Sequence, residues 1–172
     1  MVSSLGSAAV PPPGEGDHVR GDGPLAVLYL DLACPRCAGS WGRISALPLR
    51  LCVRHFPVAS KRPRSPALHH AAEAVAAQSE PAFWDFWDSL LGDRAYVDDP
   101  HLWERVRAMG LDLERFQADR RSESVIARVD RDFRSGIRAG VTGTPAGFAG
   151  TNPLGPDLEA GLEELCLRGE RA

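Results

Sequence analysis

The sequence predicts an α/β fold, and the prediction depends on two patterns. In the first, a strand pattern over residues 25–32 is followed by a helical pattern and by a second strand pattern over residues 49–56. In the second, residues 65–140 have apolar side chains at helical spacing. Two strands joined through a helix form a right-handed βαβ unit when the strands are parallel. At 172 residues, the chain has the length of a single domain.

The composition excludes several classes of protein. With 44% hydrophobic and 25% charged residues, the chain is typical of globular proteins rather than of disordered or fibrous ones. No apolar run approaches the roughly 18 residues that a transmembrane helix requires, so we expect no membrane span. The net charge of −3 and the lack of a basic segment indicate that nucleic acid is not a partner.

The first 16 residues differ from the rest of the chain. They contain three glycines and the run Pro11-Pro12-Pro13 but few side chains that could pack. This composition predicts a flexible leader over residues 1–16 and a domain over residues 17–172. Residues 1–24 also lack the apolar core of a secretory signal. With Met1 as the start we expect a cytoplasmic protein, and in that compartment paired cysteines are more often catalytic or metal-binding than structural.

Two strands and a helix are predicted around a pair of cysteines. Residues 25–32 form a nearly continuous apolar run between turn residues, which is typical of a buried central strand. A helix is predicted to begin at Pro35, because proline is tolerated in a first helical turn, and to end before Pro48. Residues 49–56 alternate apolar and basic side chains up to Pro57 and predict the second strand.

The middle of the chain is predicted to be helical and the end to be mixed. Four apolar stripes in residues 65–140 are expected to face the core, and Trp84 and Trp87 are interpreted as core residues rather than as a ligand site. The stripes are Leu68-Ala71-Ala72-Val75-Ala76, Phe83-Phe86-Trp87-Leu90-Leu91, Leu102-Val106-Met109 and Ile126-Val129-Phe133-Ile137. Residues 141–150 are rich in turns, with a short strand around 146–149, and a last helix begins at Pro156.

A C-x-x-C motif lies between the first strand and the first helix. The unpaired N–H groups and the dipole of a helix start stabilise an anion, so Cys34 is expected to be the attacking thiolate and Cys37, one turn into the helix, the resolving thiol. The intervening Pro35 and Arg36 are expected to tune the pair, because the guanidinium next to Cys34 favours the thiolate. The dithiol is itself the redox centre, and no cofactor is expected.

The other two cysteines do not form a second C-x-x-C pair. The remaining two, Cys52 and Cys166, are far apart in the sequence and have no histidine at zinc-finger spacing, so we expect no metal and interpret both as apolar fillers. Two alternatives stay open: a binding module without turnover, and a metal or iron–sulfur site made from the C-x-x-C pairs of two chains. The histidines His55, His69 and His70 are interpreted as satisfied surface or core groups.

The chain resembles the DsbA-like thiol-disulfide oxidoreductases over about residues 17–167. The resemblance depends on Asp17–Gly21, Asp31–Cys37, Arg54–Pro57, Gly110–Phe116 and Gly140–Pro145. It implies a thioredoxin-like fold with an inserted all-helical subdomain at about residues 57–140. It further implies that Cys34 and Cys37 are catalytic, and that Thr144 and a cis Pro145 bind substrate. The implied partners are a protein or small molecule with thiols or a disulfide, and a redox partner that recycles the enzyme.

The sequence departs from that family's pattern in three places. Leu28 stands where the family often has a buried acid that helps to move the proton of the resolving thiol. Asp31 matches a family position, and the residues alone fit either a role in the reaction or a cap on the strand end. After Pro145, the small pair Ala146-Gly147 and a hairpin shortened through Asn152-Pro153 change the expected peptide groove. In a reducing cytosol, a reductase or redox-linked role is expected more than an oxidase.

Overall fold

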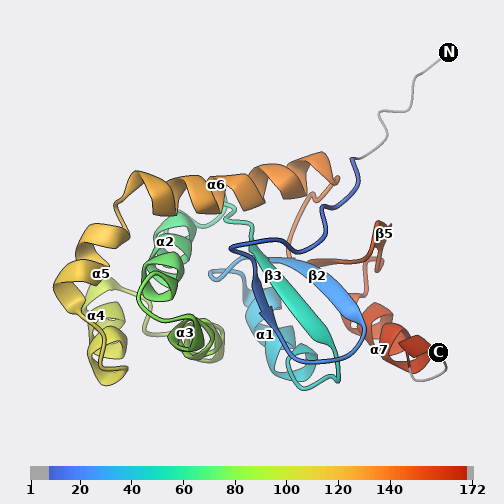
Figure 1. Ribbon diagram of the computed structural model, residues 1–172, viewed down its shortest axis with the longest axis horizontal. Helices are drawn as coiled ribbons and strands as arrows, with labels where there is room; N and C mark the ends of the chain where they lie inside the picture. The colour runs from blue at the N-terminus through green and yellow to red at the C-terminus, as the bar shows by residue number, and fades with distance from the viewer. Residues whose placement is uncertain (1–7, 170–172) are drawn as a thin grey trace, which may run out of the picture.

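The computed structural model describes residues 8–169 of the chain, and a five-stranded sheet lies at its centre (Figure 1). The strands are β1 (His18–Arg20), β2 (Leu25–Leu30), β3 (Arg50–His55), β4 (Ala146–Ala149) and β5 (Asn152–Pro153). The helices are α1 (Pro35–Ile44), α2 (Ser65–Ala76), α3 (Glu80–Gly92), α4 (Asp99–Ala108), α5 (Leu113–Asp119), α6 (Glu123–Arg138) and α7 (Leu158–Gly169). None of the helices in this part of the chain is long and apolar enough to cross a membrane.

The order of the strands across the sheet is β1-β3-β2-β4-β5. The two central strands β2 and β3 are parallel and are joined through α1, which confirms the predicted βαβ unit. The strand β4 pairs with β2 in the antiparallel direction, and the short β1 and β5 close the two edges in the same way. The sequence predicted neither edge strand, because three and two residues are too few to show a periodic pattern.

The strand β2 is buried on both faces, which explains its continuous apolar run. Because side chains alternate along a strand, Leu28 and Leu30 point into the larger core, which they share with α1 and the helices α2 to α4. Val27 and Tyr29 point into a second core on the opposite face, with Phe56 and other residues. The predicted apolar fillers Cys52 and Cys166 are both buried.

The helices α2 to α6 lie between β3 and β4, within the region of residues 57–140 where a helical insertion was expected. They extend to one side of the sheet, and α6 returns the chain along the top of the molecule (Figure 1). Trp87 is fully buried in the larger core, as predicted. The stripe predicted for α6 is wrong in part: Val129 is buried, but Ile126 and Ile137 are 44% and 53% exposed.

Residues 8–16 of the predicted leader pack on the domain, which corrects the expectation of a flexible segment for this part. Val10 is only 6% exposed and belongs to the second core. The N–H of Ala8 donates to the carbonyl of Arg138, and the Arg54 guanidinium donates to the carbonyl of Pro12. One apolar side chain and one buried guanidinium that needs acceptors are sufficient to hold the segment. Residues 1–7 lie outside the described part.

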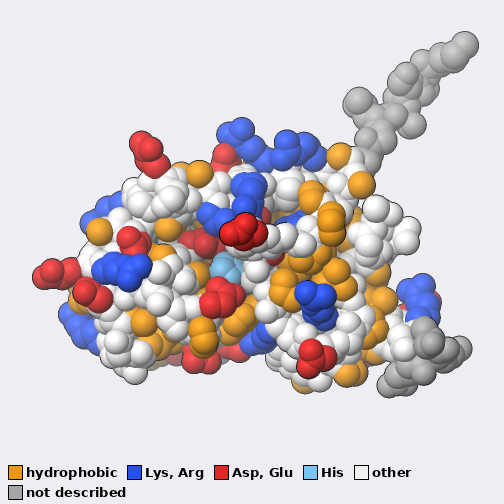
Figure 2. All heavy atoms as spheres, viewed as in Figure 1, with side chains coloured by type: hydrophobic (Ala, Val, Ile, Leu, Met, Phe, Trp, Pro, Cys, Tyr) orange, Lys and Arg blue, Asp and Glu red, His pale blue; other side chains and the backbone are white. Residues whose placement is uncertain are grey.

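The surface mixes charges of both signs. On the face drawn in Figure 2, lysine and arginine side chains alternate with aspartate and glutamate side chains, and apolar side chains gather over the sheet. Of the basic residues of β3, Arg50 is exposed, whereas Arg54 is 4% exposed and pairs with Asp17 at 3.0 Å.

Gly136 sets how closely α6 approaches the sheet. A Cβ atom at this position would lie 2.7 Å from the Phe56 ring and 2.9 Å from the Tyr29 ring. We expect Gly136→Ala to lower the free energy of unfolding by about 1–3 kcal/mol, measured by denaturant titration, because both rings are packed. The matched control is Gly42→Ala in α1, where a Cβ meets nothing within 4 Å and the gain in helix propensity should raise stability by about 0.5–1 kcal/mol. Equal effects of the two substitutions would contradict this role of Gly136.

Candidate active site

The C-x-x-C motif lies at the start of α1, as predicted. Cys34 is the residue that caps the helix in an extended conformation, and Pro35 begins the first turn. The N–H of Cys34 donates to the carbonyl of Asp31 at 2.9 Å, which fixes the turn from β2 into the helix. Both thiols are free and buried, with Cys34 0% and Cys37 1% exposed. Because proline has no N–H, the first N–H groups that can face the Cys34 sulfur are those of Arg36 and Cys37.

The two sulfurs have opposite electrostatic environments. The largest influence on the pKa of Cys34 is a hydrogen bond from the Cys37 thiol. Together with hydrogen bonds from Thr144 and from the N–H groups of Cys37 and Arg36, it outweighs burial and lowers the pKa of Cys34 to about 5. The interaction with Cys34, and then burial, raise the pKa of Cys37 far above its ordinary value. At neutral pH, Cys34 is therefore a thiolate and Cys37 a thiol. Arg36 acts on the thiolate through its backbone N–H.

The loop before β4 completes the site. The Thr144–Pro145 peptide bond is cis, and the Cys34 sulfur lies 3.5 Å from the carbonyl oxygen of Thr144, to which it donates when it is protonated. Thr144 is buried, and its hydroxyl has no other partner among residues 8–169, so it is free to donate to the Cys34 thiolate. The structure therefore brings Cys34, Cys37 and Thr144 together. Cys34 and Thr144 are 110 positions apart in the sequence.

A groove passes this loop. It has a volume of about 660 Å³ and is lined by Arg36, by the loop that contains Thr144 and Pro145, and by the basic pair Lys61-Arg62. A larger apolar cavity of about 1100 Å³ adjoins it, and its lining includes the exposed Ile126 and Ile137 of α6. Both cysteines are buried and neither lines this groove, whose lining reaches the site through Arg36, Thr144 and Pro145.

Asp31 acts as a brace between two segments. Its Oδ1 accepts from the N–H of Ala33 at 2.9 Å and from the hydroxyl of Ser65 at 2.5 Å. Its Oδ2 accepts from the N–H of Val58 at 3.1 Å and from Arg62 at 2.9 Å. Burial opposes the charged form, but His69, the Ser65 hydroxyl and the N–H of Ala33 outweigh it and hold the pKa of Asp31 well below its usual range. Four donors favour the structural interpretation of Asp31 over a role in proton transfer.

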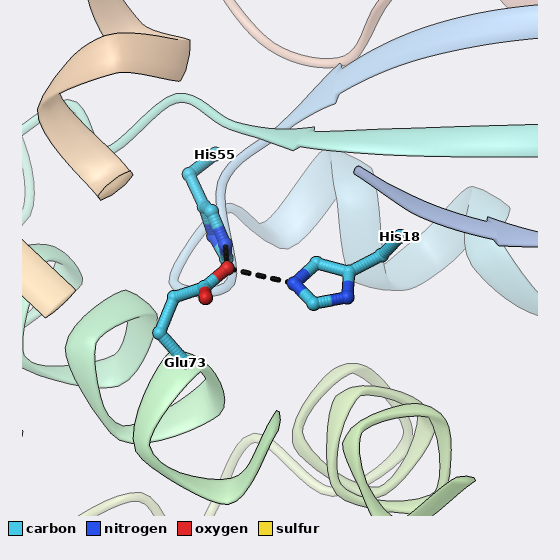
Figure 3. Close-up of side chains that lie close together, drawn as sticks. All are labelled: His18, His55 and Glu73. Carbon is cyan, nitrogen blue, oxygen red and sulfur yellow. Dashed lines mark hydrogen bonds and ion pairs between the residues drawn. The ribbon is translucent and has the colours of Figure 1, made fainter. Parts of the chain in front are cut away.

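The sequence analysis missed a second group of ionisable side chains. His18 of β1, His55 of β3 and Glu73 of α2 meet below the sheet edge (Figure 3). Their candidate metal-binding atoms lie within 4.8 Å of one another, and in residues 8–169 no other set of His, Cys, Asp and Glu does so. No local pattern in the sequence indicates this site, because His18 and His55 are 55 and 18 positions away from Glu73.

The pKa of Cys34 provides a direct test of the site. Removing the largest stabilising hydrogen bond by Cys37→Ala should raise the pKa of Cys34 from about 5 toward its ordinary value of 9.0. The midpoint of the alkylation rate against pH, and that of the thiolate ultraviolet absorbance, should both move to higher pH. The control Cys52→Ala removes a buried thiol whose pKa is raised to about 12 mainly by burial, and it should leave the Cys34 midpoint in place. An unchanged midpoint in Cys37→Ala would refute the assigned hydrogen bond.

The interpretation of Asp31 as a brace is tested by Asp31→Asn. The amide places an N–H₂ group against donors and removes the charge, so the free energy of unfolding should fall by about 1–3 kcal/mol in denaturant titrations. The exposed Asp85→Asn, in α3, is the control and should change stability little. If Asp31→Asn instead kept full stability but slowed disulfide exchange, Asp31 would have to be assigned to proton transfer.

Comparison with solved structures shows the fold. BdbD of Bacillus subtilis is 16% identical with a TM-score of 0.79, and the match covers 97% of this chain and 100% of that one. A thioredoxin-like oxidoreductase of Silicibacter pomeroyi is 22% identical with a TM-score of 0.75, covering 92% and 95%. The DsbA1 protein of Wolbachia pipientis is 18% identical with a TM-score of 0.67, covering 79% and 75%. The fold is therefore thioredoxin-like with an inserted helical subdomain, as the resemblance implied.

Closer sequence relatives are much longer proteins. The Na+/H+ antiporter NhaA of Herminiimonas arsenicoxydans is 37% identical over 166 residues, which are 91% of this chain and 26% of that protein. The antiporter NhaA 3 of Salinispora tropica is 33% identical over 88% of this chain and 24% of its own length. The chain thus spans about a quarter of the curated relatives that it matches.

A protein-family model matches most of the chain. The DSBA-like thioredoxin domain matches residues 40–160, a range that contains the helical insertion and Pro145 and that begins just after the C-x-x-C motif. The cysteines themselves are placed by the structure, at the start of α1 beside Thr144. On this match and this fold, the chain belongs to the DSBA-like thioredoxin domain family.

Proposed function

We propose that the chain is a thiol-disulfide oxidoreductase that exchanges a Cys34–Cys37 dithiol or disulfide with the thiols of proteins or small molecules. The observation that supports this most is the opposite shift of the two pKa values, low for Cys34 and high for Cys37, beside the Thr144 carbonyl. A low-pKa thiolate is the attacking group in thiol-disulfide exchange. Membership of the DSBA-like family agrees with this activity.

The exchange takes two steps, and each step forms one S–S bond and breaks another. The Cys34 thiolate attacks one sulfur of a substrate disulfide, forms a mixed disulfide and releases the other substrate sulfur as a thiolate. Cys37 then loses its proton and attacks the Cys34 sulfur, which forms the Cys34–Cys37 disulfide and releases the second substrate thiolate. Two electrons pass from the protein dithiol to the substrate disulfide. The same steps in reverse oxidise a substrate dithiol.

The low pKa of Cys34 also bears on the direction of exchange. A lowered pKa gives the reduced protein a contribution to stability that is complete above the ordinary value of 9.0 and is lost as pH falls toward about 5. The disulfide form has no thiolate and no such contribution, so the low pKa moves the pair toward the oxidising side. In the cytoplasm, which we propose as its location, glutathione would hold such a pair mainly as the dithiol, available for reductive exchange.

The proposed substrate contact is the loop before β4. We assign Thr144 and Pro145 to substrate binding, because the Thr144 carbonyl already faces the reacting sulfur and an extended peptide can pair with exposed backbone there. A further redox partner must restore the starting state after each exchange. We do not carry over ion transport from the antiporters, since this chain matches only about a quarter of their length.

The proposal is tested by an insulin-reduction assay and a dithiol-peptide oxidation assay. Wild-type protein should turn over in at least one of them, Cys34→Ala should lose this activity, and Cys37→Ala should accumulate a mixed disulfide with the substrate on Cys34, detected by mass spectrometry. The control Cys52→Ala should keep wild-type turnover. Wild-type protein that folds and shows no turnover, with no mixed disulfide trapped in Cys37→Ala, would refute the proposal and leave the binding module and the two-chain metal site as alternatives.

A further inference from the structure

Three elements bring ionisable side chains to one buried point away from the dithiol. His18, His55 and Glu73 are 4%, 0% and 8% exposed. The Nε2 atoms of His18 and His55 lie 2.7 Å and 2.5 Å from the same carboxylate oxygen, Oε1 of Glu73 (Figure 3). Two ring nitrogens from different strands thus converge on one oxygen from a helix.

We propose that His18, His55 and Glu73 bind one first-row divalent cation of the Zn²⁺ type. Two imidazoles and one carboxylate are a donor set that suits zinc and its neighbours, and three protein ligands leave a fourth position open. Ligand atoms around tetrahedral zinc are roughly 3.3 Å apart, given metal–ligand bonds of about 2.0 Å. The observed separations require only a small outward movement of the side chains to reach that spacing.

The outer hydrogen bond of His18 matches that of a metal-binding histidine, and the outer hydrogen bond of His55 matches it once His55 is the donor to His69. Such histidines usually donate the second ring N–H to a carboxylate or another acceptor. His18 Nδ1 lies 2.9 Å and 3.0 Å from the two carboxylate oxygens of Glu80. His55 Nδ1 lies 2.7 Å from Nδ1 of His69. Both candidate ligands are therefore oriented by a second group.

The ring protons show what a cation must displace. The N–H of Leu32 donates to Nε2 of His69, so the neutral His69 ring donates from Nδ1 to His55, and His55 donates from Nε2 to Glu73. A cation on His55 Nε2 reverses this order: His55 then donates to His69, whose Nε2 proton faces Asp31 Oδ1 at 3.6 Å. Binding therefore removes His69 Nε2 as the acceptor of the Leu32 N–H, two residues before Cys34.

The charges around the cluster favour a cation. Four carboxylates face it from the segment before β1 and from α2, α3 and α6, and three guanidinium groups face it from β3 and α6. They are Asp17, Glu73, Glu80 and Asp132, and Arg54, Arg128 and Arg131. Among these seven groups, the carboxylates outnumber the guanidinium groups by one.

A cavity leads to the cluster from the surface. It has a volume of about 570 Å³, and its lining includes His18, Glu73 and Glu80 together with Arg128. The opening gives a hydrated ion a route to the carboxylate. The Arg128 guanidinium, 3.8 Å from Glu73 Oε1, opposes the approach of a cation and therefore limits affinity.

The test uses Co²⁺ as the probe in a background that carries Cys34→Ala and Cys37→Ala, because a C-x-x-C pair can itself bind such metals. Titration should give one Co²⁺ per chain, with visible bands of nitrogen and oxygen ligation and no sulfur-to-cobalt charge-transfer band. Adding His18→Gln or Glu73→Gln should abolish binding. Adding Glu80→Gln, at a half-exposed outer partner, should weaken binding by about 10–100-fold.

The control is His101→Gln, which removes an exposed histidine that pairs with Asp98 and should leave Co²⁺ binding unchanged. Circular dichroism shows whether each variant is folded. If the variants at His18 and Glu73 fail to fold, the spectrum of the background protein and the effect of Glu80→Gln decide. No saturable Co²⁺ binding in the folded background protein, or equal affinity in Glu80→Gln, would overturn the proposal, and neither result bears on disulfide exchange.

Discussion

The hydrogen bonds that hold the Cys34 sulfur as an anion are the interaction on which the site depends. They come from the start of α1, from the Cys37 thiol and from Thr144 in the loop before β4. The donors belong to segments that only the folded sheet brings together, because β4 lies beside β2 and β2 leads into the C-x-x-C turn. The sheet topology is therefore a requirement of the chemistry as well as of stability.

Much of this arrangement could be predicted because its signals are local. The apolar run of β2, the proline after Cys34 and the periodic side chains of the helices are each visible within a few residues, and the structure confirms the elements that they predict. The pairing of Cys34 with Thr144 is not local. It could be expected only because a short motif around Pro145 resembles that of a known family.

The remaining features depend on contacts between distant residues, and the sequence alone could not indicate them. His18 and Glu73 are 55 positions apart, and His55 and Glu73 are 18 positions apart. The alternation of apolar and basic residues in β3 does not show that Asp17 and the Pro12 carbonyl accept hydrogen bonds from the Arg54 guanidinium. Ile126 and Ile137 fit the helical stripe of α6 but line an open cavity and are exposed.

Position 28 is a leucine and not an acid, so the second exchange step needs another way to lower the pKa of Cys37. Leu28 and Cys37 belong to the same apolar core, so residue 28 offers no group that could accept the Cys37 proton. However, the largest influence that raises the pKa of Cys37 is the Cys34 thiolate itself. When Cys34 enters a mixed disulfide its charge is lost, and the pKa of Cys37 must fall because only burial still raises it strongly. The first step thus prepares the second without a dedicated acid.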